Sequence, residues 1–281
     1  MVIGLLCNEC GVPPSVEVFT GNTQDPQTVA PQIKKVAERF GSQEVTFVGD
    51  RGMIKSQQIE ELGSEPHGFH YITAITKPQI ETLLKKNVIQ MGLFELALVE
   101  IKTHEGLRYV LRRNPARAEE IKESRQDKLN ALRKEIAKKN SYLKEHPRSK
   151  VEVAIRKVNA RSKQLKISEW VLLSAAEREI TLAIDNDTLA ENAKLDGCYV
   201  LKTDLSEAAA TKETIHDRYK DLALVESAFR TSKTVELELR PIHVRLATRT
   251  RGHAFVVMVP YRILKELSLR WQNLNLTVQK G

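Results

Sequence analysis

Two acidic residues of this 281-residue sequence lie where a carboxylate could do chemistry. Asp50 follows the apolar run Val45–Val48, and side chains at the carboxyl end of a buried strand face the ligand crevice of an α/β sheet. Glu226 lies in a helical pattern with Tyr219 seven residues before it and Lys233 seven residues after it, which places the three on one helix face. Such a pair of carboxylates among cations would suit Mg²⁺ and a phosphodiester, because hard oxygens hold the metal while Lys and Arg hold the phosphates.

The same residues also have an ordinary structural interpretation. A strand-end Asp is more often the cap of a turn than a metal ligand. Arg230 follows Glu226 by four residues on the same face, and a helix Glu beside Arg and Lys usually forms a surface ion pair worth less than about 1 kcal/mol. Residue types and spacing alone leave both interpretations open.

Basic charge is concentrated in two segments. The formal net charge of the chain is +8, yet residues 112–166 carry +11 and residues 218–281 carry +7, so the remaining residues sum to −10. A basic surplus confined to part of a chain indicates a polyanion partner, because each neutralised phosphate releases condensed counterions. Nucleic acid is the natural candidate, and the alternative is that these lysine-rich helix faces are simply solvated.

The sequence does not lead us to expect a secreted protein or one inserted in a membrane. The apolar run Met1–Cys7 is too short for a signal peptide or a membrane span. Three cysteines are too few for a disulfide framework, which fits the reducing cytoplasm. Cys7 and Cys10 have the spacing of a zinc half-site, but no second pair exists, so we do not expect a zinc centre there.

The first quarter of the chain shows an α/β pattern. Val2–Leu6 and Ser15–Phe19 flank a segment rich in Gly and Pro and predict an antiparallel hairpin. A helix is expected from Pro26 to Phe40 with Asp25 as its cap. The pattern continues with a strand, a helix and a strand, at Val45–Val48, Ser56–Leu62 and His70–Ile75. This order predicts a sheet that is partly antiparallel and partly parallel.

The rest of the chain changes character and then returns to strands. Strands are expected at Leu93–Glu100, Leu107–Leu111, Ile180–Ile184 and Cys198–Leu201, and a long helix is expected from Thr211 to about Lys233. Between them, a polar helix starts near Pro115 and pairs with a second basic helix after His146-Pro147. The apolar residues of the first of these helices form a narrow seam suited to helix pairing rather than deep burial. These residues are Leu129, Leu132, Ile136 and Leu143. Trp170 and Trp271 are expected to be packing residues.

Several motifs together resemble the DDE transposases of bacterial insertion sequences. They are VTFVGDRGM at residues 45–53, DGCYVLKT at 196–203, YKDLALVESAFRTSK at 219–233, and Arg240-Pro241-Ile242 followed by Arg251-Gly252-His253. The resemblance extends to Gly4-Leu5-Leu6 and to Phe19–Asp25, so it spans nearly the whole chain. It is specifically to the branch with a Tyr/Arg/Glu/Lys signature on the helix that bears the catalytic Glu.

The resemblance implies a fold and a domain organisation. The expected fold class is α/β: a ribonuclease H-like mixed sheet with helices, interrupted by an α+β insertion that contains a basic helical hairpin. Residues 1–76 would form the first part of the catalytic domain, without its first strand. Residues 77–195 would form the insertion domain, with strands and the hairpin. Residues 196–281 would complete the catalytic domain and add a basic C-terminal region.

The resemblance also implies an activity, a site and partners. The activity is metal-dependent DNA cleavage and strand transfer, with Asp50 as the second catalytic Asp and Glu226 as the catalytic Glu, both metal ligands. Two Mg²⁺ ions are expected, with Mn²⁺ as a substitute. The implied DNA-binding residues are Tyr219, Arg230, Lys233, Arg240 and Arg251. The implied partners are double-stranded DNA, as transposon ends and target, and a second copy in a synaptic homodimer, without a membrane.

The chain departs from the family pattern at two points. The signature Arg falls on Leu222, so either Arg218 substitutes for it or DNA handling is weakened. The family's first catalytic Asp lies on a strand upstream of the hairpin that begins here at Val2, so we expect an N-terminally truncated chain that folds poorly and is inactive alone. The rival functions are a noncatalytic DNA-binding remnant or inhibitor of the full-length enzyme, and a nuclease unrelated to transposition.

Overall fold

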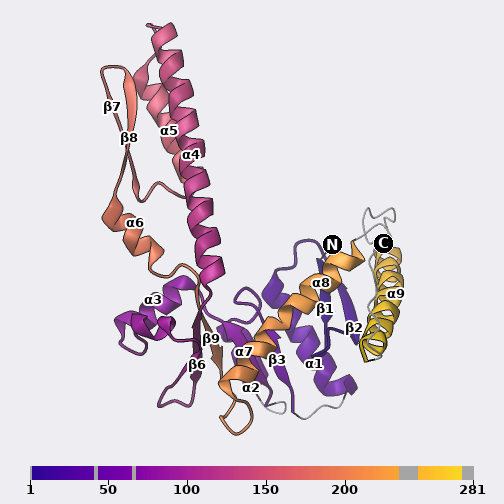
Figure 1. Ribbon diagram of the computed structural model, residues 1–281. Helices are drawn as coiled ribbons and strands as arrows, with labels where there is room; N and C mark the ends of the chain where they lie inside the picture. Colours follow the sequence, from indigo (N-terminus) through magenta and orange to yellow (C-terminus); the bar gives the residue numbers. More distant parts are fainter. Residues whose placement is uncertain (1, 41–43, 65–67, 234–245, 274–281) are drawn as a thin grey trace. The chain divides into compact units, whose positions relative to one another are not determined.

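The computed structural model describes residues 2–40, 44–64, 68–233 and 246–273. The chain divides into two compact units, one formed by Met1–Ile89, Leu98–Val110 and Val200–Gly281, and the other by Gln90–Ala97 and Leu111–Tyr199. Helices and a mixed sheet together confirm the α/β class expected from the sequence (Figure 1). Within the described ranges, no helix has both the length and the apolar composition needed to cross a membrane.

The first unit begins with the predicted hairpin, which has the predicted bounds. Strand β1 (Val2–Leu6) pairs antiparallel with β2 (Ser15–Phe19). The turn between them is held by the Asn8 side chain, whose Oδ1 accepts from the backbone N–H of Cys10 at 3.1 Å and of Val12 at 2.9 Å. Gly11 lies in the turn at φ +74°, where a residue with a side chain would be strained.

The helix after the hairpin starts differently from the expectation. A 3₁₀ turn, η1 (Asp25–Thr28), precedes α1 (Val29–Phe40), and the cap of the turn is Gln24. The Gln24 N–H donates to Oε1 of Gln27 at 3.2 Å, so this local bond starts the turn one residue earlier than predicted. The assignment of Asp25 as the cap was therefore wrong. Instead its backbone carbonyl accepts from the Thr28 hydroxyl at 2.7 Å.

A five-stranded sheet with the order β3-β4-β9-β6-β5 follows. Its strands are β3 (Thr46–Gly49), β4 (His70–Ala74), β5 (Val99–Lys102), β6 (Arg108–Arg113) and β9 (Cys198–Thr203). Strand β3 runs parallel to β4, and β4 runs antiparallel to β9, which confirms the mixed pairing. Helices α2 (Ser56–Gly63) and α3 (Lys77–Lys85) flank β4 in sequence.

One apolar core joins this sheet to α1. Its buried residues come from α1, β3, β4, α2 and the loops beside them: Val29, Ile33, Val36, Phe47, Ile54, Leu62, Phe69 and Tyr71. The helical spacing of the α1 residues and the buried strands account for this core, since a helix stripe must be covered by a sheet face. Leu6 of β1 packs against the same cluster.

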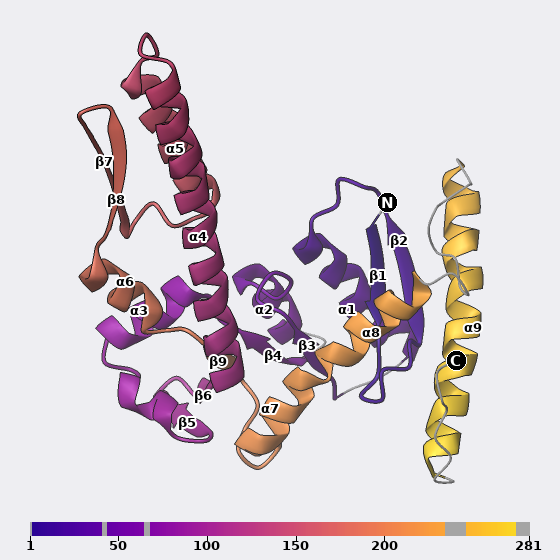
Figure 2. The same cartoon turned by 45° about the horizontal axis from the view of Figure 1, so that its top comes forward.

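Three helices complete the first unit. They are α7 (Lys212–Lys220), α8 (Leu222–Ser232) and α9 (Ala247–Asn273). Buried residues Ala254, Val257 and Met258 of α9 pack on one face of the hairpin, and Figure 2 shows α9 beside β2. Trp271, near the end of α9, is 40% exposed, so its expected packing role was wrong.

The second unit is built on a helical hairpin. Helix α4 (Pro115–Glu145) is capped by Asn114, whose side chain accepts from the Arg117 N–H at 3.2 Å, and α5 (Val151–Gln164) packs against it. The hairpin β7 (Val171–Ala176) with β8 (Glu179–Ile184) and the helix α6 (Asn186–Ala193) complete the unit. Neither β7 nor α6 was expected from the sequence.

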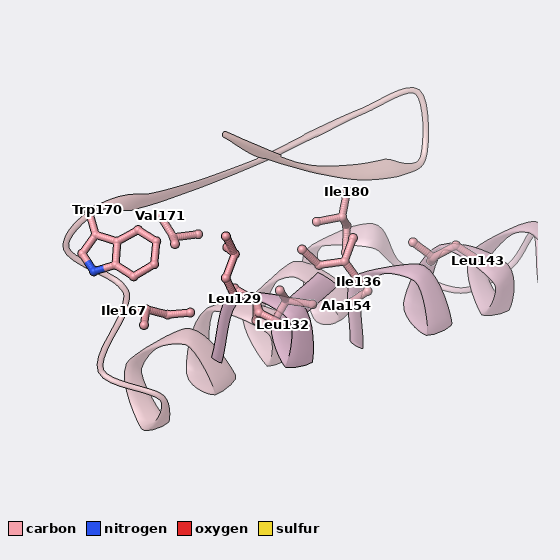
Figure 3. Close-up of a cluster of buried hydrophobic side chains, with 10 residues drawn as sticks. Leu129, Leu132, Ile136, Leu143, Ala154, Ile167, Trp170, Val171 and Ile180 are labelled. Carbon is pink, nitrogen blue, oxygen red and sulfur yellow. The ribbon is translucent and has the colours of Figure 1, made fainter. Parts of the chain in front are cut away.

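The apolar seam of α4 is deeper than predicted. Leu132 is fully buried and Leu143 is 1% exposed. Figure 3 shows the seam residues enclosed by α5, by Trp170 and by the β7–β8 hairpin. The prediction of a shallow pairing seam was wrong because the strand hairpin covers the side of α4 that α5 leaves open. The packing role expected for Trp170, which is 4% exposed, is confirmed.

The prediction of a strand at Leu93–Glu100 was also wrong in part. Residues Met91–Glu95 form the 3₁₀ turn η2, with Phe94 buried, and the strand begins only at Val99. The apolar composition of this stretch reflects burial of a turn, which periodicity alone does not separate from a short strand.

Candidate active site

Asp50 lies directly after β3, where the sequence placed it. Its Oδ1 accepts from the backbone N–H of Gly52 at 2.8 Å and of Met53 at 3.0 Å, so one oxygen caps the turn 50–53. No described residue bonds Oδ2, and the residue is exposed. The turn is tight because Ile54 packs onto Gly49, where an added Cβ would lie 2.8 Å from the Ile54 side chain. Asp50 thus acts as a turn cap and still offers one free carboxylate oxygen.

Glu226 lies in α8 and is exposed. Its carboxylate forms no hydrogen bond or ion pair with the residues that the structure describes, and Arg230 likewise has no ion-pair partner among them. The surface ion pair that the sequence left open as an alternative role for Glu226 is therefore not formed with any described residue. On the neighbouring side of the helix, Leu222, Val225 and Phe229 form an apolar stripe.

This stripe of α8 lines a cavity of about 560 Å³ in the first unit. Residues 45–48 at β3, Met53 and all of β1 also line this cavity. Val48 and Met53 flank Asp50 in sequence, and Val225 directly precedes Glu226. The two candidate carboxylates, 176 positions apart, are therefore attached to segments that line one cavity.

The helix that carries Glu226 is broken, contrary to the expectation of one helix to Lys233. Asp221 separates α7 from α8, and its N–H donates to the carbonyls of Asp217 and Arg218 at 3.1 and 3.2 Å. Tyr219 belongs to α7, while Lys233 is the C-terminal cap of α8, with its Nζ 5.9 Å from the Phe229 ring centre. Tyr219 and Glu226 thus lie on two successive helices, and a seven-residue spacing no longer ensures a common face.

Arg218 is held by two carboxylates at the same cavity. Its Nη1 lies 3.0 Å from Oε2 of Glu9 and 3.3 Å from Oδ2 of Asp221. This pairing neutralises the guanidinium and ties the β1–β2 turn to the end of α7.

Arg251 and Arg240 are the remaining DNA-binding candidates. Arg251 lies exposed on α9, without an ion pair to any described residue. Arg240 lies outside the described residues. The exposed cations Arg230 and Arg251 are thus available to a phosphate, while the geometry of a DNA surface that includes Arg240 rests on the sequence.

Metal binding requires more ligands than these two carboxylates. Among the described residues, no group of three or more His, Cys, Asp or Glu side chains is arranged to hold a metal ion. One oxygen of Asp50 is already committed to backbone N–H groups, whereas Mg²⁺ prefers six oxygen ligands. The described residues therefore do not form a complete metal site by themselves.

The cavity also contains a thiol with altered chemistry. Cys7 lines it, and burial raises the pKa of this thiol to about 11, although Lys265 partly offsets the effect. Burial raises the pKa of Tyr261 for the same reason, with a further contribution from Cys7. A thiol with so high a pKa stays protonated at neutral pH and makes a poor nucleophile or metal ligand.

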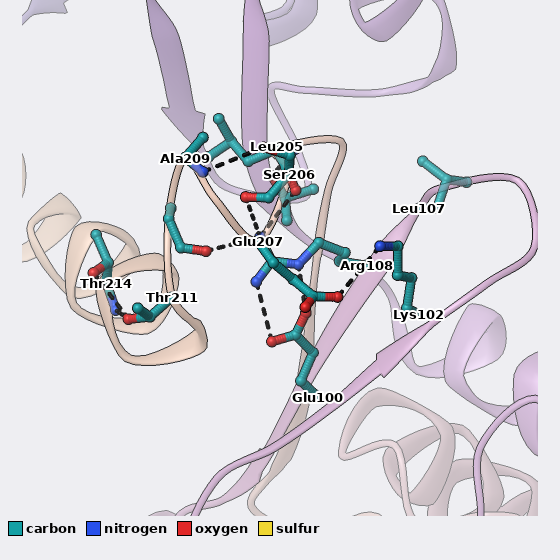
Figure 4. Close-up of polar contacts among 12 residues, drawn as sticks. Glu100, Lys102, Leu107, Arg108, Leu205, Ser206, Glu207, Ala209, Thr211 and Thr214 are labelled. Atoms are coloured by element: carbon teal, nitrogen blue, oxygen red, sulfur yellow. Dashed lines mark hydrogen bonds and ion pairs between the residues drawn. The ribbon is translucent and has the colours of Figure 1, made fainter.

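The sequence analysis did not single out Arg108, which is 1% exposed and holds the segment between β9 and α7. Its Nη1 donates to the carbonyls of Leu205, Ser206 and Ala210, each at 2.9 Å. Its Nε and Nη2 pair with both carboxylate oxygens of Glu100, as Figure 4 shows. Opposite charges on two predicted strands around Gly106 were a visible signal, but the pattern gave no indication that the pair is buried.

The fold and site define a mixed α/β protein with two separated carboxylates beside one cavity. A family model described as the transposase DDE domain matches residues 3–261. The chain therefore belongs to the DDE transposase family, whose members act in DNA transposition and recombination and use divalent metals. Searches among curated proteins and among solved structures gave no significant match.

Proposed function

We propose that this chain provides part of the catalytic core of an insertion-sequence transposase, which cuts DNA and joins its strands. Asp50 and Glu226 are the metal ligands that this chain contributes. The observation that carries the proposal is the common cavity, because residues adjacent to each carboxylate line it from β3 and from α8. Two separate parts of the sequence, each carrying one of the carboxylates, thereby border one cavity.

The fold supports a ribonuclease H-like core with an insertion. Strand β3 with Asp50 and helix α8 with Glu226 belong to the first unit, while Leu111–Tyr199 between them form most of the second unit. A long segment that packs its own core can be accommodated between two parts of another domain. We assign the Tyr/Arg/Glu/Lys branch on the motif at residues 219–233, with Leu222 as its departure.

DNA is the proposed partner of the basic segments. Residues 112–166 and 218–281 carry the basic surplus, and Arg230, Lys233, Arg240 and Arg251 would hold phosphates near the carboxylates. Tyr219 would contact DNA from α7. Joining two transposon ends to a target requires a synaptic complex, for which we propose a homodimer.

Incubation of the purified chain with DNA that spans its own gene and both flanks tests the proposal. With Mg²⁺ or Mn²⁺ we expect nicks at the element ends and joined products, and loss of both with Asp50→Asn or Glu226→Gln. Cleavage without joining would instead indicate a nuclease outside transposition. The absence of both, with salt-sensitive DNA binding retained, would indicate a noncatalytic protein.

That noncatalytic function is the second candidate. It is favoured by the arrangement of the described residues, among which no three potential ligands come together. Such a chain would bind transposon ends and inhibit a complete transposase. Addition of increasing amounts to a transposition assay in cells that carry a complete related element would then lower the transposition frequency, and variants at Asp50 would inhibit equally well.

A further inference from the structure

An exposed pair of stacked aromatic rings lies at the C-terminal end of α4 in the second unit. The rings of Tyr142 and His146 have their centres 4.1 Å apart and their planes at 17°. Nδ1–H of His146 donates to the Tyr142 carbonyl at 3.1 Å, which fixes the orientation of the imidazole. Tyr142 is 50% exposed and His146 is exposed as well, so the pair presents aromatic surface to solvent.

The backbone around these rings is held by the β7–β8 hairpin, whose turn lies at the same end of the unit as the α4–α5 loop (Figure 1). The Asn140 side chain exchanges two hydrogen bonds of 2.9 Å with the backbone of Ile180. Nη2 of Arg178 donates to three carbonyls of the helix end and the loop, at 3.1 to 3.2 Å: those of Leu143, His146 and Ser149. We call residues 142–150, together with Glu177 and Arg178, the hairpin tip.

The turn that carries Arg178 has a strained backbone. Glu177 and Arg178 have φ of +47° and +67°, in the left-handed region that disfavours residues with a Cβ. Two-residue hairpin turns of this kind are ordinarily Asn-Gly or Gly-Gly. The contacts of the Arg178 guanidinium with the three carbonyls offset the strain. Strain kept at an exposed position is typical of a surface whose shape serves binding.

The hairpin tip is basic and otherwise polar. It has a formal charge of +2, and its exposed cations without an ion-pair partner among the described residues are Lys144, Arg148 and Lys150. Val153 is the only other exposed large apolar side chain in residues 140–153, a range that the structure describes throughout. A surface that binds another protein is centred on a cluster of apolar anchors. An isolated aromatic pair among cations fits a nucleic acid better.

Unpaired bases are the part of a nucleic acid that such a surface can recognise. In a duplex the faces of each base are covered by neighbouring base pairs, whereas an unpaired base has a free face that can stack on Tyr or His. We propose that the hairpin tip binds single-stranded DNA by stacking a base on the Tyr142–His146 pair, with the three exposed cations of the tip at the phosphates. The inference rests on the proposed function in taking DNA as the partner, and it assigns no catalytic step to the tip.

Comparison of a thymidine strand with an abasic strand separates stacking from charge. Oligo(dT) and a strand of abasic sites, both of about 12 nucleotides, carry the same phosphates, and fluorescence anisotropy measures their dissociation constants for the full chain. We expect oligo(dT) to bind at least about fivefold more tightly, because base–aromatic stacking adds to the phosphate contacts.

Three variants locate the stacking. Tyr142→Ala should remove the preference for oligo(dT), and Tyr142→Phe should retain it because Phe keeps the ring. Phe255→Ala is the matched control: Phe255 is a 61% exposed aromatic residue of the first unit, and its loss should leave the preference unchanged. Melting temperatures show whether each variant is folded.

Equal affinity for the two strands, or a preference that survives Tyr142→Ala, would overturn the inference. If duplex DNA still binds in that case, the proposed DNA partner stands and only the stacking fails; if neither strand nor duplex binds, both fail. Photocrosslinking of the unsubstituted chain to an oligonucleotide with 5-iododeoxyuridine gives a second measurement that needs no variant. We expect the crosslinked peptides to contain Tyr142 or His146, and crosslinks confined to other peptides would show that the inference is wrong.

Discussion

The Asp50 carboxylate accepts the Gly52 backbone N–H at 2.8 Å, and so the residue closes a turn with one oxygen while leaving the other free. The two interpretations of a strand-end Asp are therefore compatible in this chain. A cap fixes the orientation of the carboxylate before any ligand arrives, which lowers the entropic cost of binding. Structural and chemical roles of Asp50 can be separated by substitution, because an amide oxygen can replace a carboxylate oxygen as acceptor.

Asp50→Asn and Asp50→Ala should differ in stability but agree in function. Asn keeps an acceptor for the Gly52 N–H, so the free energy of unfolding should change little, whereas Ala removes it and should lower stability by about 1 kcal/mol. Both remove the charge and should abolish any Mg²⁺-dependent cleavage. Urea denaturation measures the stabilities. Equal destabilisation by both substitutions would contradict the capping role.

Arg108→Met should destabilise the first unit strongly. The substitution leaves the Glu100 carboxylate and the carbonyls of Leu205, Ser206 and Ala210 without their donor in a largely buried site, at a cost of about 3 kcal/mol. Lys102→Met is the control, because the Lys102–Glu207 pair is exposed on both sides and should contribute less than about 1 kcal/mol. Thermal denaturation of both variants gives the comparison, and similar losses would show that burial does not strengthen the Arg108 network.

Cys7 should react with iodoacetamide far more slowly than Cys10. Its pKa of about 11, against the ordinary 9.0, lowers the thiolate fraction at pH 8 about a hundredfold. Because burial disfavours the thiolate, the rate should rise about tenfold per pH unit until the pH approaches 11. Mass spectrometry of Cys10→Ser and Cys7→Ser chains follows each thiol separately. Denaturation should raise the Cys7 rate, and a native rate already equal to that of Cys10 would contradict the buried environment.

The sequence predicted those elements whose signals are local. The bounds of β1 and β2 followed from alternation around a Gly- and Pro-rich turn, and the start of α4 followed from Pro115. The break at Asp221 was missed because the residue keeps helical angles, φ −61° and ψ −14°, and the apolar spacing continues across it. The depth of Leu132 was missed because a strand hairpin 40 residues further along covers it.

The candidate site also combines features that local sequence predicted with features that depend on long-range packing. The position of Asp50 after a buried strand was predictable from the residues beside it. Its cap was a recognised alternative, but the sequence could not decide between the cap and the ligand. The cavity shared with α8 was beyond prediction, since it depends on how β1, β3 and α8 pack across long sequence separations. The neutralisation of Arg218 by Glu9 likewise joins residues 209 positions apart.

The DNA-binding role that we propose for the basic residues of the second unit depends on which lysines of α4 are already paired. Lys134 and Lys138 are exposed and have no ion-pair partner among the described residues. Lys122 lies 3.0 Å from Glu119 and Lys139 lies 3.3 Å from Glu135, so their charges are partly neutralised within the helix. Unpaired lysines are the ones that can replace counterions on a phosphate backbone.

The double substitution Lys134→Ala with Lys138→Ala should therefore weaken DNA binding and lower the slope of log affinity against log salt by about 1.8, which corresponds to two lost phosphate contacts. Lys122→Ala with Lys139→Ala removes the same formal charge from the same helix and should change the slope by less than half as much. Fluorescence anisotropy with a duplex of random sequence at several salt concentrations measures both slopes. Equal slopes for the two double variants would indicate that only the total charge of α4 matters. Unchanged binding by the Lys134/Lys138 double variant would place the DNA surface elsewhere on the chain.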